Sequence, residues 1–486
     1  MKKGEIYTGT VSSYEFPNKG IVILEDMKIT VKNTLPGQKI SFRLTKKRQG
    51  RGTGQVVEII EHGSFEDGDA FCDIYGRCGS CLYQTLSYET QAEHKKDMVL
   101  SLIDKVCTDY TFDGIKSSPD IYGYRNKMEF TFGDEEKGGP LTLGLHKRGS
   151  FYDILDADCC KLVHRDYGLI LKAVRSFCKD NALPYYHRMS HEGYLRHLLI
   201  RRAAVTGEML IDIVTTSKID QDFSELVSTI TGLKNELEGT VTGILHTVND
   251  NVADTITDEG TTILYGKDYF FEEILGLRFR ISPFSFFQTN SLGAEVLYST
   301  AREYIKDLIK DKIIYDLYSG TGTIAQLLAP VAKKVIGVEI VAEAVEAAKE
   351  NAALNDIHNC EFIAGDVLKV LDSIDGSSEK PDLIVLDPPR DGVHPKALKH
   401  IIDYGVENIL YISCKTTSLV RDLEVMQENG YALKRVSVVD MFPWTAHVET
   451  CCLLERLRNA KDHVTFTLEM EDYYRIKDAE ADKEKR

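Results

Sequence analysis

The chain has 486 residues, 43% hydrophobic and 28% charged, which is ordinary for a globular protein of two or three domains. No uninterrupted apolar stretch of about 18 residues occurs, which argues against a membrane span, and residues 1–5 do not lead into a signal-peptide core. We therefore expect a cytosolic protein, and a monomer. The formal net charge of -16 by itself argues against a nucleic-acid partner.

The first 62 residues differ from the rest in charge and in pattern. Residues 1–60 carry eleven Lys and Arg against five Asp and Glu, so a net +6 precedes a remainder of -22. Short strands are predicted at 20–24, 27–31, 39–44 and 55–61, with an exposed basic loop at 46–52. Strands of this length with a basic loop favour an OB-type β-barrel that binds RNA. A barrel without a ligand and a merely solvated Lys-rich surface are the alternatives.

Residues 63–280 are predicted to form a β-rich central domain, interrupted by helical pieces at 164–180 and 220–233. The helical stretch within 87–117 is expected to pack on the domain that follows. The spacing Cys72-x5-Cys78-x2-Cys81 is a metal signature that lacks a fourth thiolate, and Cys159 or Cys160 can supply it. Four thiolates suit either zinc or an iron–sulfur cluster, and the spacing does not choose between them.

From 281 to 456 strands and helices alternate, which predicts a parallel α/β sheet. The segment 313–324 contains a strand, a glycine turn and the start of a helix. Glu339 and Asp366 end the next two strands, where carboxylates can accept hydrogen bonds from ribose hydroxyls and an adenine amino group. Neither a third glycine nor a phosphate-binding lysine follows. An adenosine without a pyrophosphate indicates S-adenosylmethionine; two surface carboxylates are the alternative.

Asp387 and Cys414 each follow a buried-type strand, so both are predicted at the crevice beyond the carboxyl ends of the sheet. A cysteine there is often only a packing residue. A thiolate, however, can add to carbon 6 of uracil and turn carbon 5 into a nucleophile for a methyl group, after which a base removes the carbon-5 proton. Glu449 is the candidate base, and a solvated glutamate is its alternative.

At these residues the sequence closely resembles the RNA uracil-5-methyltransferase family, specifically its iron–sulfur 23S ribosomal RNA branch. The resemblance covers about residues 5–455 and is carried by the segments 285–290, 316–323, 387–390, 413–415 and 440–449. It implies a Rossmann-like S-adenosylmethionine methyltransferase domain at 281–456, behind an N-terminal TRAM barrel at 1–62 and a central iron–sulfur domain at 63–280.

The resemblance also implies roles for single residues. Cys414 would be the nucleophile and Glu449 the proton-abstracting base. Contacts with the methyl donor or the target base would come from Gln288, Tyr318, Gly320, Thr323, Glu339, Asp366 and Asp387. A 4Fe-4S cluster would be held by Cys72, Cys78, Cys81 and Cys160, which favours Cys160 over Cys159.

Two positions depart from the commoner family pattern. Lys415 and Trp444 stand where the family often has Asn and His, and they are expected to alter RNA contacts only. Phe286 and Phe287 can stack on an extruded base, or else belong to the core. Methylation of transfer RNA is the rival activity, and a non-catalytic RNA-binding protein is the rival from another class. The charged tail 457–486 is expected to be frayed.

Overall fold

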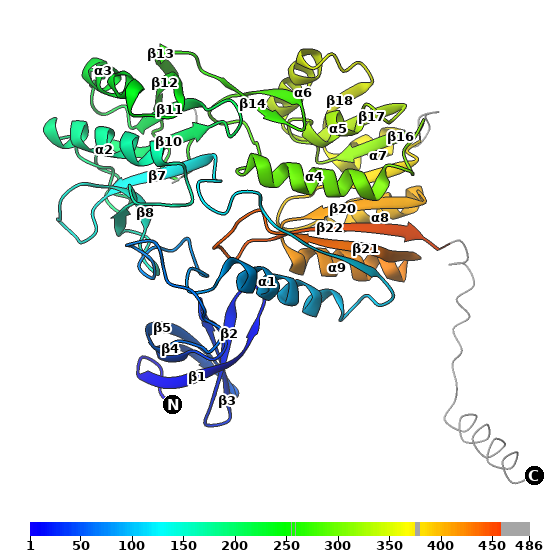
Figure 1. Ribbon diagram of the computed structural model, residues 1–486, viewed down its shortest axis with the longest axis horizontal. Helices are drawn as coiled ribbons and strands as arrows, with labels where there is room; N and C mark the ends of the chain where they lie inside the picture. Colours follow the sequence, from blue (N-terminus) through cyan, green and yellow to red (C-terminus); the bar gives the residue numbers. More distant parts are fainter. Residues whose placement is uncertain (254, 258, 375–379, 458–486) are drawn as a thin grey trace, which may run out of the picture.

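A computed structural model describes residues 1–253, 255–257, 259–374 and 380–457, and Figure 1 shows their arrangement. Apart from Leu457, the predicted charged tail lies outside the described residues. Within the described ranges, no helix is both long and apolar enough to cross a membrane.

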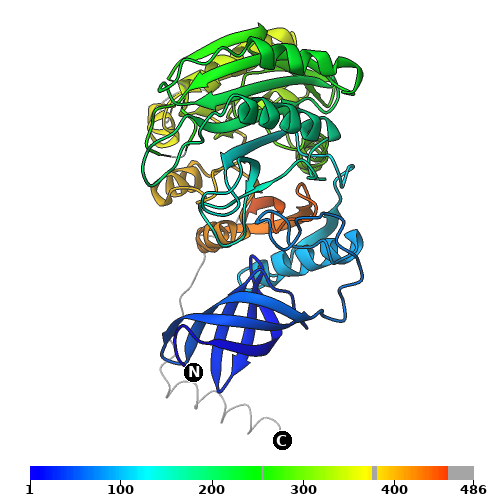
Figure 2. The same cartoon turned by 90° about the vertical axis from the view of Figure 1, so that its left-hand side faces the viewer.

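The N-terminal strands form a closed barrel in the order β1-β2-β3-β5-β4, which fits the expected OB-like domain. Alternate side chains of its strands fill the interior, and Val22, Ile29 and Phe42 are fully buried there. In Figures 1 and 2 the barrel lies at one end of the molecule, below the two sheets. Its strands are β1 (Ile6–Glu15), β2 (Lys19–Leu24), β3 (Met27–Lys32), β4 (Lys39–Arg48) and β5 (Arg51–Glu61).

The basic segment 46–52 is not a loop, contrary to expectation. Strand β4 continues to Arg48, which pairs with Arg51 at the start of β5, so the basic side chains lie on a long hairpin. The β4–β5 ladder continues past the strand ends that the hydrophobic pattern marks, because backbone hydrogen bonds do not require apolar side chains. The lysines and arginines at 46–48 and 51 are exposed on it.

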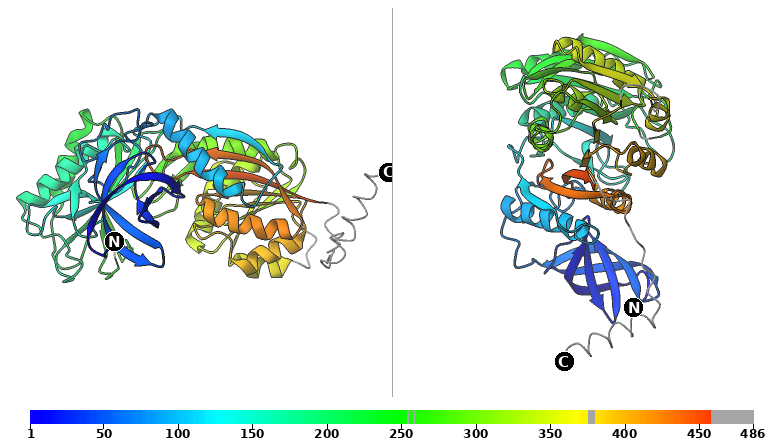
Figure 3. Two further views of the ribbon diagram at one scale, coloured as in Figure 1. Left: turned by 90° about the horizontal axis from the view of Figure 1, so that it is seen from below. Right: turned by 90° about the vertical axis from the view of Figure 1, so that its right-hand side faces the viewer.

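Between the barrel and the central domain, the chain contributes one helix and one strand to the C-terminal domain. Helix α1 (Tyr88–Ile103) begins at Ser87, whose hydroxyl accepts a hydrogen bond from the Thr90 N–H at 3.2 Å. Strand β6 (Thr111–Lys116) then pairs in parallel with a strand near the C-terminus. Figure 3 shows α1 between the barrel and the C-terminal domain. Residues 87–117 thus lie against the later domain.

The central domain is a seven-stranded sheet in the order β13-β12-β11-β10-β7-β8-β9. Helices α2 (Arg165–Asp180) and α3 (Ser224–Gly232) cover one face and share a hydrophobic core with it. A short 3-10 turn, Leu233–Asn235, follows α3. The strands are β7 (Lys127–Gly133), β8 (Thr142–His146), β9 (Ile154–Asp156), β10 (Leu195–Arg202), β11 (Glu208–Thr215), β12 (Thr240–Val248) and β13 (Thr261–Gly266).

The C-terminal domain is a mixed eight-stranded sheet in the order β18-β17-β16-β19-β20-β22-β21-β6. The alternating pattern predicts parallel strands, and β16 to β20 are parallel, but β22 runs antiparallel to both of its neighbours. The strands are β16 (Ile313–Leu317), β17 (Lys334–Glu339), β18 (Cys360–Ala364), β19 (Leu383–Leu386), β20 (Asn408–Ser413), β21 (Tyr431–Val439) and β22 (Glu449–Arg456).

Two layers of helices sandwich this sheet. One hydrophobic cluster packs α4 (Ser291–Ile305), α5 (Thr323–Leu328) and α6 (Ala342–Leu354) on one face. A second packs α1 with α7 (Val367–Ile374), α8 (Pro395–Tyr404) and α9 (Thr416–Glu428) on the other. The hairpin of β14 (Phe270–Ile274) and β15 (Leu277–Ile281) contributes Phe279 to the first cluster. The expected domain boundary at 280 therefore falls inside β15.

Candidate active site

The reversed strand β22 brings the candidate base to the candidate nucleophile. Strand β20 pairs antiparallel with β22, and its last residue, Ser413, lies opposite Thr450. Beyond the end of β20, one further step in this register would bring Cys414 level with Glu449, the first residue of β22. Side chains that face each other across antiparallel strands lie on the same face of the sheet, with Cβ atoms about 5 Å apart. The thiol and the carboxyl are thus neighbours at one end of the sheet, as the sequence predicts for Cys414 alone.

These groups perturb each other electrostatically. Burial raises the pKa of Cys414 to about 11, with contributions from the carboxyls of Glu449 and Asp387. Burial also raises the pKa of Asp387 to about 7. The pKa of Glu449, which is 5% exposed, is raised well above its usual value by burial and then by Asp387. A thiol and two carboxyls with raised pKa values therefore lie within electrostatic reach of one another.

Arg390 is a cation that lies close to Cys414 and Glu449. Its guanidinium lowers the pKa of both Cys414 and Glu449, and it hydrogen-bonds to the Nδ1 atom of His447 at 2.9 Å. Lys415, by contrast, directs its ammonium to Asp391 at 3.9 Å. The positive setting that a reactive thiol requires therefore comes from Arg390 rather than from the adjacent lysine.

The glycine turn after β16 has the backbone of a ligand-binding turn. Gly320 and Gly322 have φ angles of 54° and 73°, and Tyr318 shares this left-handed conformation at 69°. Such a φ is rare for a bulky residue and tends to occur at functional turns. Thr323, 8% exposed, begins α5 directly behind the turn.

Carboxylates surround this turn. Glu339 accepts hydrogen bonds from the Gly320 and Val341 N–H groups, each at 3.0 Å, so its carboxylate is fixed beside the turn. Asp366 is exposed after β18, and its Oδ1 accepts from the Leu368 N–H at 3.0 Å. Both acidic residues thus stand at the carboxyl ends of adjacent parallel strands, where the sequence predicts them.

Asp316 lies beneath the turn, in the last part of β16. It is fully buried, and its Oδ2 accepts from the Ala325 N–H at 3.1 Å while its Oδ1 has no partner among the described residues. Burial raises its pKa to about 8, with a further contribution from Asp387. A buried acceptor without a partner suggests a bound group that supplies the missing donor.

The two phenylalanines of segment 285–290 have different environments. Phe287 is 5% exposed and packs against Phe279, with ring centroids 5.6 Å apart. Phe286 is 68% exposed and lies 3.8 Å from the position of a Cβ on Gly320. Core packing is thus correct for Phe287, whereas Phe286 is free to stack at the glycine turn.

The loop that carries Phe286 is held by a buried arginine of the central domain. Arg201 on β10 is 1% exposed, and its Nη1 donates to three carbonyl oxygens of the loop at 2.7 to 3.1 Å. Gln288 lies in the same segment, and its side chain is close enough to Tyr298 of α4 to lower the pKa of that hydroxyl. Burial and then Asp387 raise the pKa of Tyr298. The central domain therefore positions one wall of the site.

The segment 440–448 before Glu449 is anchored by a buried ion pair. The Nζ of Lys95 on α1 lies 2.6 Å from Asp440 Oδ1 and 3.0 Å from the Phe442 carbonyl oxygen, and both charged side chains are fully buried. Asn290, the cap of α4, donates to the Met441 carbonyl oxygen at 2.8 Å. These contacts hold the backbone of the segment that leads into Glu449.

Trp444 lies in the interior. It therefore cannot contact RNA directly, contrary to the expectation that it alters RNA contacts. It is 4% exposed, and its indole Nε1 donates to the Ile121 carbonyl oxygen at 2.6 Å. Its own carbonyl oxygen accepts from the Leu82 N–H at 2.8 Å. Trp444 thus connects the segment before Glu449 to the cysteine loop, residues 72–82, which carries Cys72, Cys78 and Cys81.

Four cysteines gather in that loop region. Cys72, Cys78, Cys81 and Cys160 line one small pocket, and Cys159 is not among the residues that line it. Burial raises the pKa of Cys160 to about 11 and that of Cys81 to about 12. In the described ranges, no three His, Cys, Asp or Glu side chains are close enough to hold a single metal ion.

Sequence reasoning missed several residues of the site. Arg390 belongs to the segment 387–390, but nothing in the sequence shows that it faces Cys414. Tyr298 and Arg201 carry no clear sequence signal, because their places depend on a helix and a strand from separate parts of the chain. A mid-strand arginine among apolar residues, as at 198–201, was the one available hint.

Comparison with known proteins agrees with this geometry. A family model described as tRNA (Uracil-5-)-methyltransferase matches residues 203–457. An uncharacterized RNA methyltransferase of Clostridium tetani is 48% identical over 94% of this chain and 99% of its own length. Another, from Caldanaerobacter subterraneus, is 47% identical over 94% of this chain and 100% of its own length.

A solved structure shares the fold. The tRNA (uracil-54, C5)-methyltransferase of Pyrococcus abyssi, in complex with S-adenosyl-L-homocysteine, superposes with a TM-score of 0.70 at 23% identity, over 92% of this chain and 100% of that one. At this identity the likeness shows the fold alone, whereas the family model and the two relatives extend to the activity. The chain therefore belongs to the tRNA (uracil-5-)-methyltransferase family and is an RNA methyltransferase.

Proposed function

We propose that this enzyme methylates carbon 5 of a uridine in 23S ribosomal RNA, with Cys414 as nucleophile and Glu449 as base, acting in the cytosol as a monomer. The observation that carries the proposal is the antiparallel register of β20 and β22, in which Ser413 lies opposite Thr450, so that Cys414 and Glu449 are the next residues at the same end of the two strands. The carboxyl of Glu449 contributes to the raised pKa of Cys414, which supports their proximity.

The proposed reaction starts from the deprotonated forms of Cys414 and Glu449, and each step moves one electron pair. The Cys414 thiolate, favoured by Arg390, forms a bond to carbon 6, and the electrons of the 5,6 double bond move to carbon 5 and oxygen 4. Bound S-adenosylmethionine would supply the methyl group to carbon 5, and S-adenosylhomocysteine would leave with the electron pair of the broken sulfur–methyl bond. Glu449 then removes the carbon-5 proton; the released pair restores the 5,6 double bond, and the carbon–sulfur bond breaks.

The glycine turn and its carboxylates suit the methyl donor. Glu339 and Asp366 would hold the adenosine, while Tyr318, Gly320 and Thr323 would line its place, with Gln288 and Asp387 towards the reacting end. The Oδ1 of buried Asp316, which has no partner in the described part of the chain, and the left-handed backbone at Tyr318 support a bound group here. The Pyrococcus abyssi protein of the same fold holds S-adenosyl-L-homocysteine.

We also infer a 4Fe-4S cluster held by Cys72, Cys78, Cys81 and Cys160. Their convergence on one pocket supports it. The cluster would brace the cysteine loop and, through Trp444, the segment before Glu449. Anaerobically purified protein should be brown and contain iron, and Cys72→Ser should lose both while Cys360→Ala keeps them.

The RNA target has two candidates. The N-terminal OB-like barrel with its exposed basic hairpin supports a TRAM-type RNA-binding role and a large RNA such as 23S ribosomal RNA. The matching family model and the Pyrococcus abyssi enzyme are both named for tRNA instead. Mapping 5-methyluridine in both RNAs, from cells with and without this gene, separates the two. Loss confined to tRNA would refute the ribosomal assignment.

A further inference from the structure

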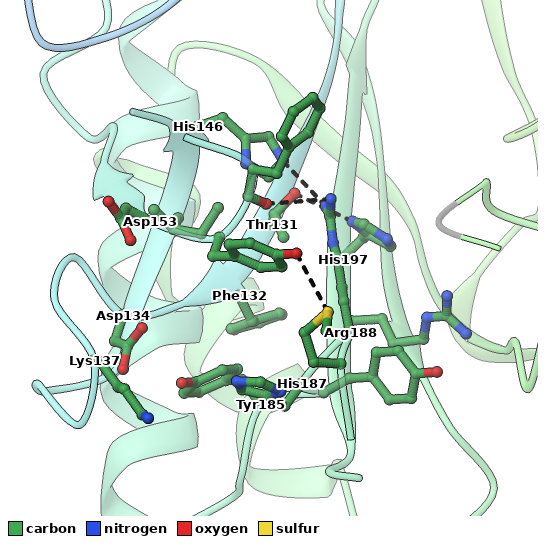
Figure 4. Close-up of a pocket in the computed structure, with 16 residues that line it drawn as sticks. Thr131, Phe132, Asp134, Lys137, His146, Asp153, Tyr185, His187, Arg188 and His197 are labelled. Carbon is green, nitrogen blue, oxygen red and sulfur yellow. Dashed lines mark hydrogen bonds between the residues drawn. The ribbon is translucent and has the colours of Figure 1, made fainter. Parts of the chain in front are cut away.

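A second pocket lies in the central domain. It opens between β7, the loop after β8 and the turn before β10. Figure 4 shows Phe132 in its middle, with Asp134 and Lys137 on one side and His146, Arg188 and His197 on the other. None of the residues assigned to methyl transfer or to the cysteine pocket lines it.

The rim of this pocket carries large exposed apolar side chains. Phe151 is 78% exposed, Met189 68% and Tyr152 55%, and all three line the mouth. Exposed aromatic groups gathered around a hollow, over buried Phe132, are typical of a ligand site and unusual for plain surface.

The rim is ordered by contacts across the mouth. The Tyr152 hydroxyl donates to Met189 Sδ at 3.3 Å. Arg188 donates to the Phe151 carbonyl oxygen at 3.4 Å and contacts His146 Nε2 at 3.1 Å. The two sides of the pocket are therefore linked before any ligand binds, which reduces the entropy lost on binding.

The polar groups suit the edge of a nucleobase and its phosphate. Asp134 is 7% exposed at the floor and accepts from the Gly138 N–H at 2.7 Å. Tyr185 lies near it, and burial and then Asp134 raise the pKa of Tyr185 to about 12. A carboxylate can accept from exocyclic amino groups, while Lys137 and Arg188 can approach phosphate. Flat aromatic faces with cations at the rim favour RNA over an apolar peptide.

The pocket adjoins the N-terminal barrel, to which the proposed function assigns RNA binding, and the cysteine loop, to which it assigns the cluster. A Cβ on Gly149 would lie 2.9 Å from Gln55 Nε2, so the rim loop touches strand β5 of the barrel. The Gly79 N–H donates to the His146 carbonyl oxygen at 3.2 Å, and Arg148 Nη2 donates to that of Cys81 at 2.7 Å. An RNA that follows the barrel would reach the pocket without leaving the surface.

We propose that this pocket binds one unpaired nucleobase of the substrate RNA, separate from the uridine that is methylated. The inference rests on the proposed function only for the identity of the RNA. The base stacks against Tyr152 and Phe151, its edge meets Asp134, and its phosphate meets Lys137 or Arg188. The pocket thereby selects a loop in which two bases are extruded at a fixed separation.

The test uses the full chain with the double change Phe151→Leu/Tyr152→Leu, which removes both rings but keeps apolar bulk. Tyr265→Leu is the matched control, since Tyr265 is 44% exposed on β13 of the same sheet and outside the pocket. Dissociation constants for ribosomal RNA and ultraviolet cross-links mapped to peptides are measured, together with kcat and KM for methylation.

The double variant should bind RNA about 10-fold more weakly or worse, the loss expected on removing base stacking. Its RNA KM should rise while kcat holds, and cross-links within 146–154 should disappear. Unchanged binding, or wild-type protein without cross-links in 146–154 or 185–189, would overturn the pocket assignment. Wild-type protein that shows these cross-links but methylates no 23S transcript would refute the ribosomal function and support the pocket.

Discussion

Replacing Glu449 by Gln separates the two halves of the proposed reaction. The amide has nearly the volume of the carboxyl, so the 5% exposed site keeps its packing. General-base catalysis typically contributes about 10²- to 10⁴-fold, so kcat should fall by that factor, or roughly 3 to 5 kcal/mol of activation free energy. Glu449 also raises the pKa of Cys414, so its removal favours the thiolate and leaves the first bond-forming step intact.

A covalent protein–RNA complex should therefore accumulate in Glu449→Gln. The assay is a denaturing gel of RNA incubated with the protein and methyl-labelled S-adenosylmethionine, in which the label migrates with the protein. Glu455→Gln, an exposed change on the same strand β22, should behave as wild type. Full turnover by Glu449→Gln would refute its role as base. Absence of the complex, with the RNA still bound, would refute a thiol adduct that forms before proton removal.

Further predictions concern charge, folding and the cluster. Because the Cys414 pKa of about 11 lies above neutrality, the thiolate fraction and single-turnover adduct formation should increase roughly tenfold per pH unit near pH 7. Arg390→Gln should raise that pKa and slow adduct formation at every pH, whereas Lys415→Met should not, since Lys415 faces Asp391. Lys95→Met leaves Asp440 buried without its partner and should lower the free energy of unfolding by about 3–5 kcal/mol in urea titrations, against little change for the partly exposed Lys96→Met. Iron chelation should destabilise wild-type protein in the same titration and leave Cys72→Ser unaffected.

Much of the site could be predicted because its residues follow buried apolar strands. Asp316, Glu339, Asp387 and Cys414 each stand at or near the end of such a run, and parallel strands bring their carboxyl ends to one edge. Strand order did not need to be known for this inference. The same logic applies to the barrel, where short alternating strands indicate closure without giving the partner of each strand.

The direction of β22 could not be predicted. Its apolar run at 449–454 reads the same for a parallel or an antiparallel strand, yet only the antiparallel arrangement brings Glu449, its first residue, to the level of Cys414. Long-range contacts explain the other differences. Trp444 is buried because Phe71 and Tyr122 pack on it, with ring centroids 5.0 and 5.4 Å away, and both come from distant segments.

The strand β6 limits how this enzyme can be divided. Thr111 pairs with Arg435, 324 positions later, so the outermost strand of the catalytic sheet is translated long before its neighbour. A fragment that begins at 281 would lack β6, so β21 would become an edge strand with unpaired backbone donors and acceptors. Such an edge strand promotes aggregation. On the ribosome, residues 111–116 can pair with β21 only after about 320 more residues have been synthesised. Synthesis of this protein therefore ends with the insertion of one of its earliest strands.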